Sequence, residues 1–263
     1  MYCYLYDTFL KDKKFLKTKL KIENRLTDLD LKGRSYQLTI LNNAREIARE
    51  AARQGAKTLV VIGDDKLTTK VIDVIAHYDD IALGIIPVGG DLKISKSFDI
   101  PAGLAACDTL SGRIVKNISL GKINDFYFLD QISMPLQNTT VNFDEKYNIQ
   151  TLNQNQSLEI SNLNQRLAEN NQRLEAIILE TKDKKFFNFF GQKSQSSIFN
   201  IKRAAINGPS IPIKIDNQKV IKSPALIEVV PNKLRVIVGK KLNNQGTGQL
   251  KNGRTEQLGD GAT

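Results

Sequence analysis

A short run of apolar, β-branched residues constrains the fold of this chain more than any other feature. Residues 57–62 read Lys-Thr-Leu-Val-Val-Ile, which is typical of a strand buried on both faces of a parallel sheet. Strand-like runs at 2–6, 34–41 and 81–88 alternate with helical spacing at 12–26, 43–54 and 67–77. This alternation predicts an α/β fold in which residues 1–130 form a doubly wound, mostly parallel sheet.

The second half of the chain has a different pattern. Helical spacing fades after about residue 113, and the strand-like segments are 117–132, 139–144, 147–151, 157–163, 173–181, 211–216 and 225–238. We therefore expect a mainly β, sandwich-like second domain over residues 131–240. Residues 241–263 are rich in Gly, Asn, Gln and Thr, which predicts a disordered tail.

Composition excludes several classes of protein. With 41% hydrophobic and 25% charged residues the chain is expected to fold. Two cysteines and one histidine, His77, argue against a disulfide framework, a zinc site and a Ser-His-Asp triad. No apolar run is long enough to cross a membrane and no secretion signal is evident, so we expect a cytoplasmic protein, at most peripheral at the inner face of a membrane.

Positive charge is concentrated in the second half. The net charge of +10 divides into +3 for residues 1–130, +6 for 131–240 and +1 for 241–263. The excess favours an anionic partner, such as an acidic membrane surface, a lipid or a nucleotide, although a merely solvated lysine-rich surface is an equal alternative. Four phenylalanines and four lysines in 182–193 suit a membrane interface or the core of the β domain. Nucleic acid is disfavoured because no nucleic-acid-binding motif occurs.

The candidate ligand-binding loops follow the predicted strands. No Walker A loop or GxGxxG motif occurs, but the strand at 57–62 runs into Gly63-Asp64-Asp65-Lys66, and the strand at 81–87 runs into Val88-Gly89-Gly90. Glycine allows a ligand to approach the backbone, and Asp64 could bind Mg²⁺ or accept a hydroxyl proton. The competing interpretation is that Asp64 only caps the next helix, which is the commoner role of such a residue.

The order of these segments resembles the diacylglycerol kinase catalytic-domain family, which is related to sphingosine kinases and NAD kinases. The family's Gly-Gly-Asp-Gly-Thr stretch is matched by residues 62–66 (IGDDK), and its Ile-Ile-Pro-x-Gly-Thr-x-Asn-Asp stretch by 85–93 (IIPVGGDLK). Two further segments match at 120–130 and 216–236. The resemblance implies an NAD-kinase-like fold in which residues 225–240 pack back near the first domain.

The resemblance also implies a set of site residues. They are Asp64 and Asp216 as catalytic candidates, Gly63, Asp65, Lys66, Gly89 and Gly90 for the nucleotide, and Asp64 with Glu175 for a metal. Glu175 closes the segment 171–175 (NQRLE), which matches a bacterial-type Asp-Gly-x-Leu-Asp pattern but has an amide in the first position. ATP and Mg²⁺ are the implied cofactors if the protein is active, and none otherwise.

The departures from the family fall on residues that phosphoryl transfer needs. Ile62, Asp65 and Lys66 replace Gly, Gly and Thr around the phosphates. Leu92 and Lys93 replace the Asn-Asp pair. The implied general base of the Asp-Gly-Glu segment is Gln218, and an amide cannot take a proton. We therefore expect a weakly active or inactive pseudokinase that acts as a binding or scaffold module; the alternative is an ATP-dependent lipid kinase with a rewired site.

Overall fold

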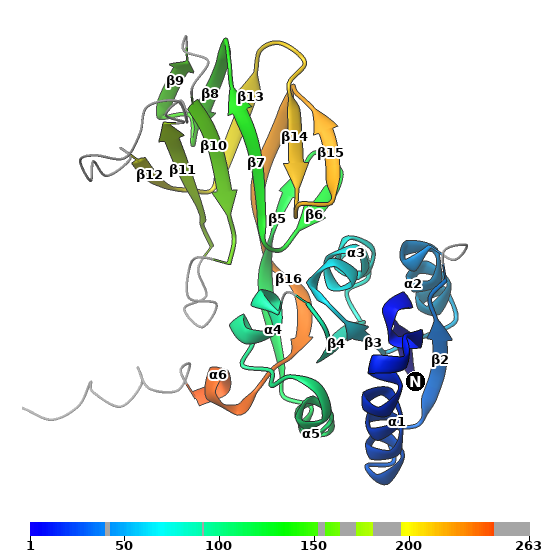
Figure 1. Cartoon of the computed structure of the whole chain (residues 1–263). Helices are drawn as coiled ribbons and strands as arrows, with labels where there is room; N and C mark the ends of the chain where they lie inside the picture. The colour runs from blue at the N-terminus through cyan, green and yellow to red at the C-terminus, as the bar shows by residue number, and fades with distance from the viewer. Residues whose placement is uncertain (40–42, 91, 152–155, 164–171, 181–195, 245–263) are drawn as a thin grey trace, which may run out of the picture.

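The computed structural model describes residues 1–39, 43–90, 92–151, 156–163, 172–180 and 196–244. Two sheets organise these residues into two lobes, which lie side by side in Figure 1. The first sheet has ten strands and extends from the parallel first lobe into the second lobe, and the other has six strands and belongs to the second lobe alone. This arrangement confirms the predicted fold class.

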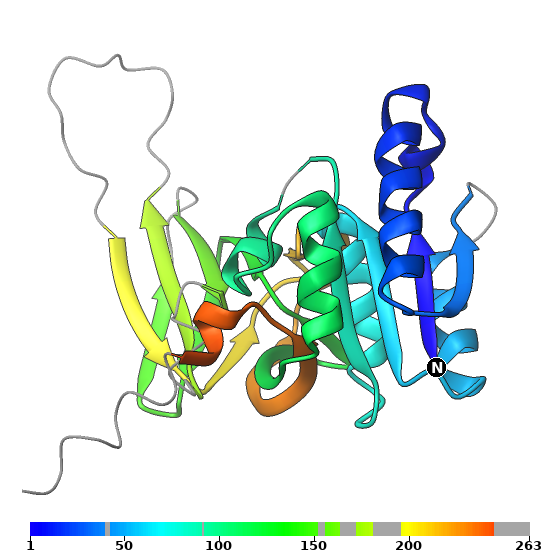
Figure 2. The ribbon, with the colours of Figure 1, turned by 90° about the horizontal axis from the view of Figure 1, so that it is seen from below.

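Four parallel strands form the centre of the first lobe, in the order β2-β1-β3-β4. Strands β3 and β4 are buried along their whole length, as their apolar sequences predict. Helices α2 and α3 pack against each other on one face, and α1 contacts α5 on the other (Figures 1 and 2). The strands are β1 (Tyr2–Tyr6), β2 (Gly33–Gln37), β3 (Thr58–Gly63) and β4 (Ala82–Pro87). The helices are η1 (Thr8–Lys11), α1 (Lys13–Asp28), α2 (Ala44–Arg53), α3 (Asp65–Ile75), α4 (Lys93–Ser97), η2 (Gly103–Ala105) and α5 (Ala106–Gly112).

The second lobe is built from antiparallel strands. In the six-stranded sheet the order is β12-β11-β10-β7-β14-β15. Its strands are β7 (Gln131–Leu136), β10 (Gln156–Ser161), β11 (Leu174–Glu180), β12 (Ser196–Ile201), β14 (Pro212–Ile215) and β15 (Lys219–Lys222). The facing strands are β5 (Val115–Ile123), β6 (Phe126–Phe128), β8 (Thr139–Phe143), β9 (Tyr147–Thr151) and β13 (Arg203–Asn207).

One long strand, β16 (Ala225–Ile237), joins the two lobes. Its first part pairs with β13 of the second lobe, and its last part pairs in parallel with β4, where Arg235 lies opposite Ala82. Strand β5 runs antiparallel to it across both parts. The two hydrophobic cores therefore take residues from opposite ends of one continuous pair of strands, which joins the lobes.

Several predicted boundaries were wrong, each for a local reason. The expected strand 117–132 is interrupted at Asn124, whose φ of 49° turns the chain between β5 and β6. The expected strand 34–41 ends at Gln37, and α3 begins two residues earlier than expected because Asp64 caps it. Strands β12, β13 and β15 were not predicted. Residues 240–244, at the start of the expected tail, form the short helix α6 (Lys240–Asn244).

Candidate functional site

The carboxyl ends of β1, β3 and β4 meet at one edge of the parallel sheet. Tyr6 lies opposite Ile62, and Gly63 lies opposite Pro87, so the residues that follow these strands are neighbours. The Asp7 amide donates to the Ile62 carbonyl at 2.9 Å, and the Val88 amide donates to the Gly63 carbonyl at 2.9 Å. The predicted loops at 63–66 and 88–90 are thereby brought together beside Asp7.

Asp64 is the N-cap of α3. Its Oδ1 atom accepts the backbone N–H groups of Lys66 at 2.9 Å and Leu67 at 3.1 Å. A methyl group placed on Gly90 would lie 4.0 Å from Asp64 Oδ2, so that second oxygen faces the glycine loop after β4. Asp64 was interpreted either as a helix cap or as a ligand-binding residue. The geometry is compatible with both roles, because one oxygen caps α3 and the other faces the candidate ligand loop.

The space beside Gly63 is occupied by Asp7. A Cβ atom on Gly63 would lie 2.8 Å from both Cβ and Oδ2 of Asp7, which is closer than side-chain atoms pack. Burial raises the pKa of Asp7 above its ordinary value, and the nearby negative charge of Asp64 raises it further. Gly63 thus makes room for a carboxylate of the same chain at the place where a ligand phosphate was expected.

The space beside Gly89 is occupied by a ring. Gly89 has a φ of 91°, and a Cβ atom there would lie 2.7 Å from the ring of Phe9. The Phe9 ring is held against Phe15, with their centroids 4.9 Å apart. A glycine of the loop that follows β4 is therefore covered by an aromatic side chain from η1.

Asp65 and Lys66 do not point into the cleft as a pair. Asp65 Oδ2 accepts the backbone N–H of Ile94 at 3.0 Å and so ties the start of α3 to α4. The Lys66 side chain is exposed, while its carbonyl accepts a hydrogen bond from Gln218 Nε2 at 2.8 Å. Through these hydrogen bonds Asp65 connects α3 to α4, and Lys66 connects α3 to the turn between β14 and β15.

The hairpin turn between β14 and β15, which contains Asp216, lies against the start of α3. Asp216 and Asn217 both have positive φ, at 46° and 56°, conformations that Asp and Asn tolerate in tight turns. The Asp216 carboxylate accepts the backbone N–H groups of Leu129, Asp130 and Gln131 at 3.3, 3.0 and 3.0 Å. Burial raises the pKa of Asp216 to about 7, although these three hydrogen bonds lower it. Asp216 anchors the turn to the start of β7.

Gln218 connects this turn to α3. Its Nε2 group donates to the Lys66 carbonyl at 2.8 Å and also to the Thr69 hydroxyl. Its Oε1 atom is buried and has no hydrogen-bond partner among the described residues. The contact with the Lys66 carbonyl needs the amide nitrogen, because a carboxylate has no hydrogen to donate to a carbonyl. The amide at this position is therefore part of the contact between the lobes.

Lys93 begins α4 in the first lobe, and Glu175 lies on β11 in the second lobe. Lys93 Nζ forms an ion pair with Asp130 Oδ1 at 2.6 Å. Glu175 lies on β11, opposite Ser161 of β10, and Ser161 in turn lies opposite Gln131. Two strand spacings of about 4.8 Å separate it from the residues that Asp216 holds. Within the described ranges, no three His, Cys, Asp or Glu side chains gather in a way that could hold a metal ion.

Comparison with known proteins agrees with this architecture. The family described as the diacylglycerol kinase catalytic domain matches residues 11–123, which is less than half of the chain. A diacylglycerol kinase from Bacillus anthracis str. Sterne has a TM-score of 0.73 and 14% identity, covering 92% of this chain and 97% of that one. Residues 11–123 are similar to the diacylglycerol kinase catalytic domain, and the whole chain has the fold shared by diacylglycerol kinase-like and NAD kinase-like structures.

Two NAD kinase-like structures extend the comparison. An NAD kinase from Archaeoglobus fulgidus in complex with ATP has a TM-score of 0.58 and 10% identity over 92% of this chain and 95% of that one. A yeast NADH kinase complexed with NADH has a TM-score of 0.56 and 9% identity over 99% and 90%. The sequence matches no curated protein. At these identities the solved structures establish the fold of this diacylglycerol kinase-like chain and not its chemistry.

Sequence reasoning placed Gly63, Asp64, Gly89 and Gly90 in one region, and the structure brings these four together. It missed the role of Phe9, because nothing in a local pattern relates residue 9 to a glycine eighty positions later. The segment 182–193, proposed for a membrane interface, lies outside the described residues. In the described part of the chain, no helix has the length and apolar character needed to span a bilayer.

Proposed function

We propose that this diacylglycerol kinase-like protein is a pseudokinase, a binding module with little or no phosphotransfer activity. The observation that carries the proposal is the filling of both glycine positions in the cleft. Asp7 takes the space beside Gly63, and Phe9 takes the space beside Gly89. A phosphate chain that lay on these backbones would have to displace a carboxylate and an aromatic ring. Close approach to the backbone is the reason such loops use glycine.

The charges of the cleft support the same proposal. Phosphoryl transfer depends on positive groups and metal ions that act together on a developing negative charge. Here Asp7 and Asp64 place two carboxylates beside each other, and Lys93 is paired with Asp130. Gln218 cannot act as a general base, and its amide is used in the contact with α3. General-base loss alone typically lowers a rate by a factor of about 10²–10⁴.

A nucleotide is the best-supported small-molecule partner. The NAD kinase-like structures are described with ATP and with NADH, and a Cβ atom placed on Gly90 would have only Asp64 Oδ2 as a neighbour, at 4.0 Å, so Asp7 and Phe9 do not cover this glycine. We propose weak binding of an adenine nucleotide there. The fit for Mg²⁺ is poor, because Asp64 Oδ1, Asp65 Oδ2 and the Asp216 carboxylate already accept backbone N–H groups.

Thermal unfolding with nucleotides tests the binding part of this proposal. Purified protein is heated with ATP, ADP or NAD, with and without Mg²⁺, since a ligand of the folded state must raise the melting temperature. We expect a small shift that does not depend on Mg²⁺. Replacing Phe9 by Ala should enlarge the shift, because the ring no longer covers Gly89. Tyr147→Ala, which removes an exposed ring of the second lobe, is the control.

An activity assay tests the catalytic part. Lipid-dependent ATP turnover is measured with diacylglycerol and with a sphingoid base, and NAD is tested as an acceptor. We expect turnover well below about 1 s⁻¹, a usual lower level for kinases. Turnover above that level, abolished by Asp64→Asn, would contradict the pseudokinase proposal and establish instead an active lipid kinase with a rewired site.

An acidic membrane surface is proposed as the second partner, on the strength of charge alone. The excess of six positive charges in residues 131–240 would contribute about 1 kcal/mol for each lysine near an acidic bilayer. Co-sedimentation with acidic and with neutral vesicles tests this. We expect binding only to acidic vesicles, weakened by salt, and equal sedimentation with both kinds would refute it.

A further inference from the structure

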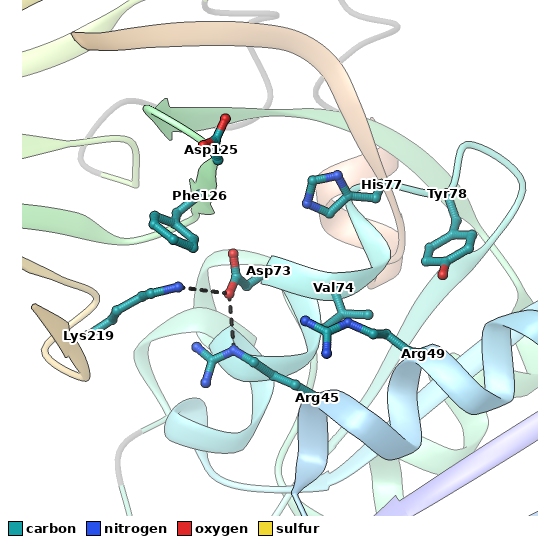
Figure 3. A pocket seen from close by; sticks show the side chains of 9 residues that line it. All are labelled: Arg45, Arg49, Asp73, Val74, His77, Tyr78, Asp125, Phe126 and Lys219. Atoms are coloured by element: carbon teal, nitrogen blue, oxygen red, sulfur yellow. Dashed lines mark hydrogen bonds and ion pairs between the residues drawn. The ribbon is translucent and has the colours of Figure 1, made fainter. Parts of the chain in front are cut away.

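A pocket lies on the side of α3 that faces α2, away from the strand ends. It has a volume of about 240 Å³. Figure 3 shows its principal side chains, which come from both lobes: Arg45 and Arg49 from α2, Asp73 from α3, His77 just beyond it, Phe126 from β6 and Lys219 from β15. Asp73 is nine residues beyond Asp64, which places the pocket about 13 Å along the helix from the cleft.

Three cationic side chains converge on this pocket. Arg45 Nε lies 3.1 Å from Asp73 Oδ2, and Lys219 Nζ lies 4.0 Å from the same oxygen. The second distance is short enough for an ion pair but too long for a hydrogen bond, so the Lys219 ammonium group does not donate a hydrogen bond to Asp73. Figure 3 shows that both cations approach Asp73 from different sides.

Arg49 contributes a further positive charge with no partner. It forms no hydrogen bond and no ion pair with any residue in the described part of the chain, and it lies one turn beyond Arg45 on the same helix. Asp125, an exposed residue at the margin, is the second carboxylate of the pocket. Three cations therefore face two carboxylates, and the lining has an excess of positive charge.

The neighbouring positive charges act on Lys219. Burial lowers the pKa of Lys219 below its ordinary value, the charges of Arg45 and Arg49 lower it further, and Asp73 opposes them. The ammonium also lies over the ring of Phe126, 3.0 Å from the ring centroid. A bound anion between these cations would offset their mutual repulsion.

We propose that this pocket binds a phosphate group, as free inorganic phosphate or as the phosphate of a small organic monoester. Arginine guanidinium groups match phosphate oxygens with paired N–H donors, and the lysine adds a compact charge. The volume lies just below the usual range of about 300–1,000 Å³ for ligand pockets, which suits a small ligand. Because the donors come from both lobes, the ligand bridges α2 to the β14–β15 hairpin.

Isothermal titration at constant ionic strength tests the proposal, with inorganic phosphate and glycerol 3-phosphate as probes. Arg49→Gln removes an exposed side chain without a partner, so the fold is retained, and we expect phosphate affinity to fall about tenfold or more. Lys219→Gln should weaken binding similarly. Arg53→Gln is the matched control, because Arg53 is also exposed on α2, one turn farther on, and does not line the pocket.

The two probes separate the possible sources of the phosphate. Tighter binding of glycerol 3-phosphate than of inorganic phosphate, lost in Arg49→Gln, supports an organic monoester. Equal binding of both supports free phosphate. Equal weakening by Arg49→Gln and Arg53→Gln, or heats that sodium chloride reproduces at the same ionic strength, would overturn the proposal, because either result means that surface charge alone attracts the anion.

Discussion

The two sides of helix α3 differ in how their space is used. On the side of the strand ends, Asp7 and Phe9 fill the space beside Gly63 and Gly89, and Gln218 bonds to the first turn of the helix. On the side of α2, charged side chains surround a pocket of about 240 Å³ and leave it open. Side chains of the same chain fill the space beside Gly63 and Gly89, whereas the pocket beside α2 has space for a small ligand.

The difference shows that a fold can be kept while its site is changed by a few contacts. Strands β1, β3 and β4 are paired as a parallel sheet, and β3 is buried along its whole length. Beyond the strand ends, Asp7, Phe9 and Gln218 contact other parts of the chain. Substitutions at these positions therefore break contacts that now exist.

The largest expected effect is a pH dependence that comes from Asp216. Burial raises its pKa to about 7 in the folded protein, so between about pH 4 and pH 7 the folded state holds a proton that the unfolded chain releases. The free energy of unfolding should fall as pH rises across this window, by up to about 1.4 kcal/mol per pH unit. Denaturant unfolding at several pH values measures the slope.

Asp216→Asn should flatten that slope, since an amide does not titrate. Asp7, whose pKa is also raised, contributes in the same direction and stays present in both proteins. Asp12→Asn, which removes an exposed carboxylate that makes no cap hydrogen bond, corrects for the loss of one surface charge. Identical slopes in the wild type and in Asp216→Asn would show that Asp216 does not carry the effect.

The second prediction concerns the packing of Phe9 on Gly89. Gly89→Ala should destabilise the protein by about 3 kcal/mol, because alanine is strained at a φ of 91° and its methyl group would overlap the ring. In a Phe9→Ala background the overlap with the ring is absent, and the same change should cost only about 1–2 kcal/mol, which comes from the strain of alanine at a positive φ.

Gly103 offers a matched control for backbone strain without any side-chain overlap. Its φ is 64°, and nothing lies within 4 Å of a Cβ atom placed there. Gly103→Ala should therefore cost about 1–2 kcal/mol and show no coupling to Phe9. If Gly89→Ala cost the same as Gly103→Ala, the ring would not fill the glycine space, and the contrast between the two sides of α3 would lose its main support.

The parallel half of the fold was predictable because burial on both faces leaves a strong pattern. Strands β3 and β4 are apolar without interruption, and their bounds were predicted to within a residue or two. Strands β13 and β15 have only one buried face or none, and their sequences, RAAIN and KVIK, carry too few apolar residues for a clear alternation. The turn at Asn124 was missed because apolar residues continue on both sides of it.

The site was only partly predictable, because its contacts join distant residues. Asp64 was found because a strand, a glycine and a helix start follow one another in the sequence. Gln218 was recognised through the family motif, but its bonds to Lys66 and Thr69 span about 150 residues. The basic pocket was not predicted at all, since Arg45 and Lys219 approach Asp73 only in the folded chain.

A smaller effect is expected from restoring the family glutamate. Gln218→Glu places a carboxylate against the Lys66 carbonyl and removes the two donated hydrogen bonds, so we expect a loss of about 1–3 kcal/mol in the free energy of unfolding. Gln137→Glu makes the same change at an exposed position and should have little effect. An equal loss in both variants would contradict a structural role for the amide. Phosphotransfer activity in Gln218→Glu would show that the glutamate was the one missing group.

The smallest effect is expected on the open side of α3. Arg49 is exposed and has no ion-pair partner among the described residues, so Arg49→Gln should change the free energy of unfolding by no more than about 0.5 kcal/mol without ligand. Arg45→Gln removes a half-buried ion pair with Asp73 and should cost about 1 kcal/mol. Because Arg49 lies beside the other cations of the pocket, its removal also relieves repulsion, which offsets part of any loss. Urea unfolding of both variants measures these changes. If Arg49→Gln lowers the free energy of unfolding as much as Arg45→Gln does, Arg49 stabilises the fold, and its side chain is not available to a ligand.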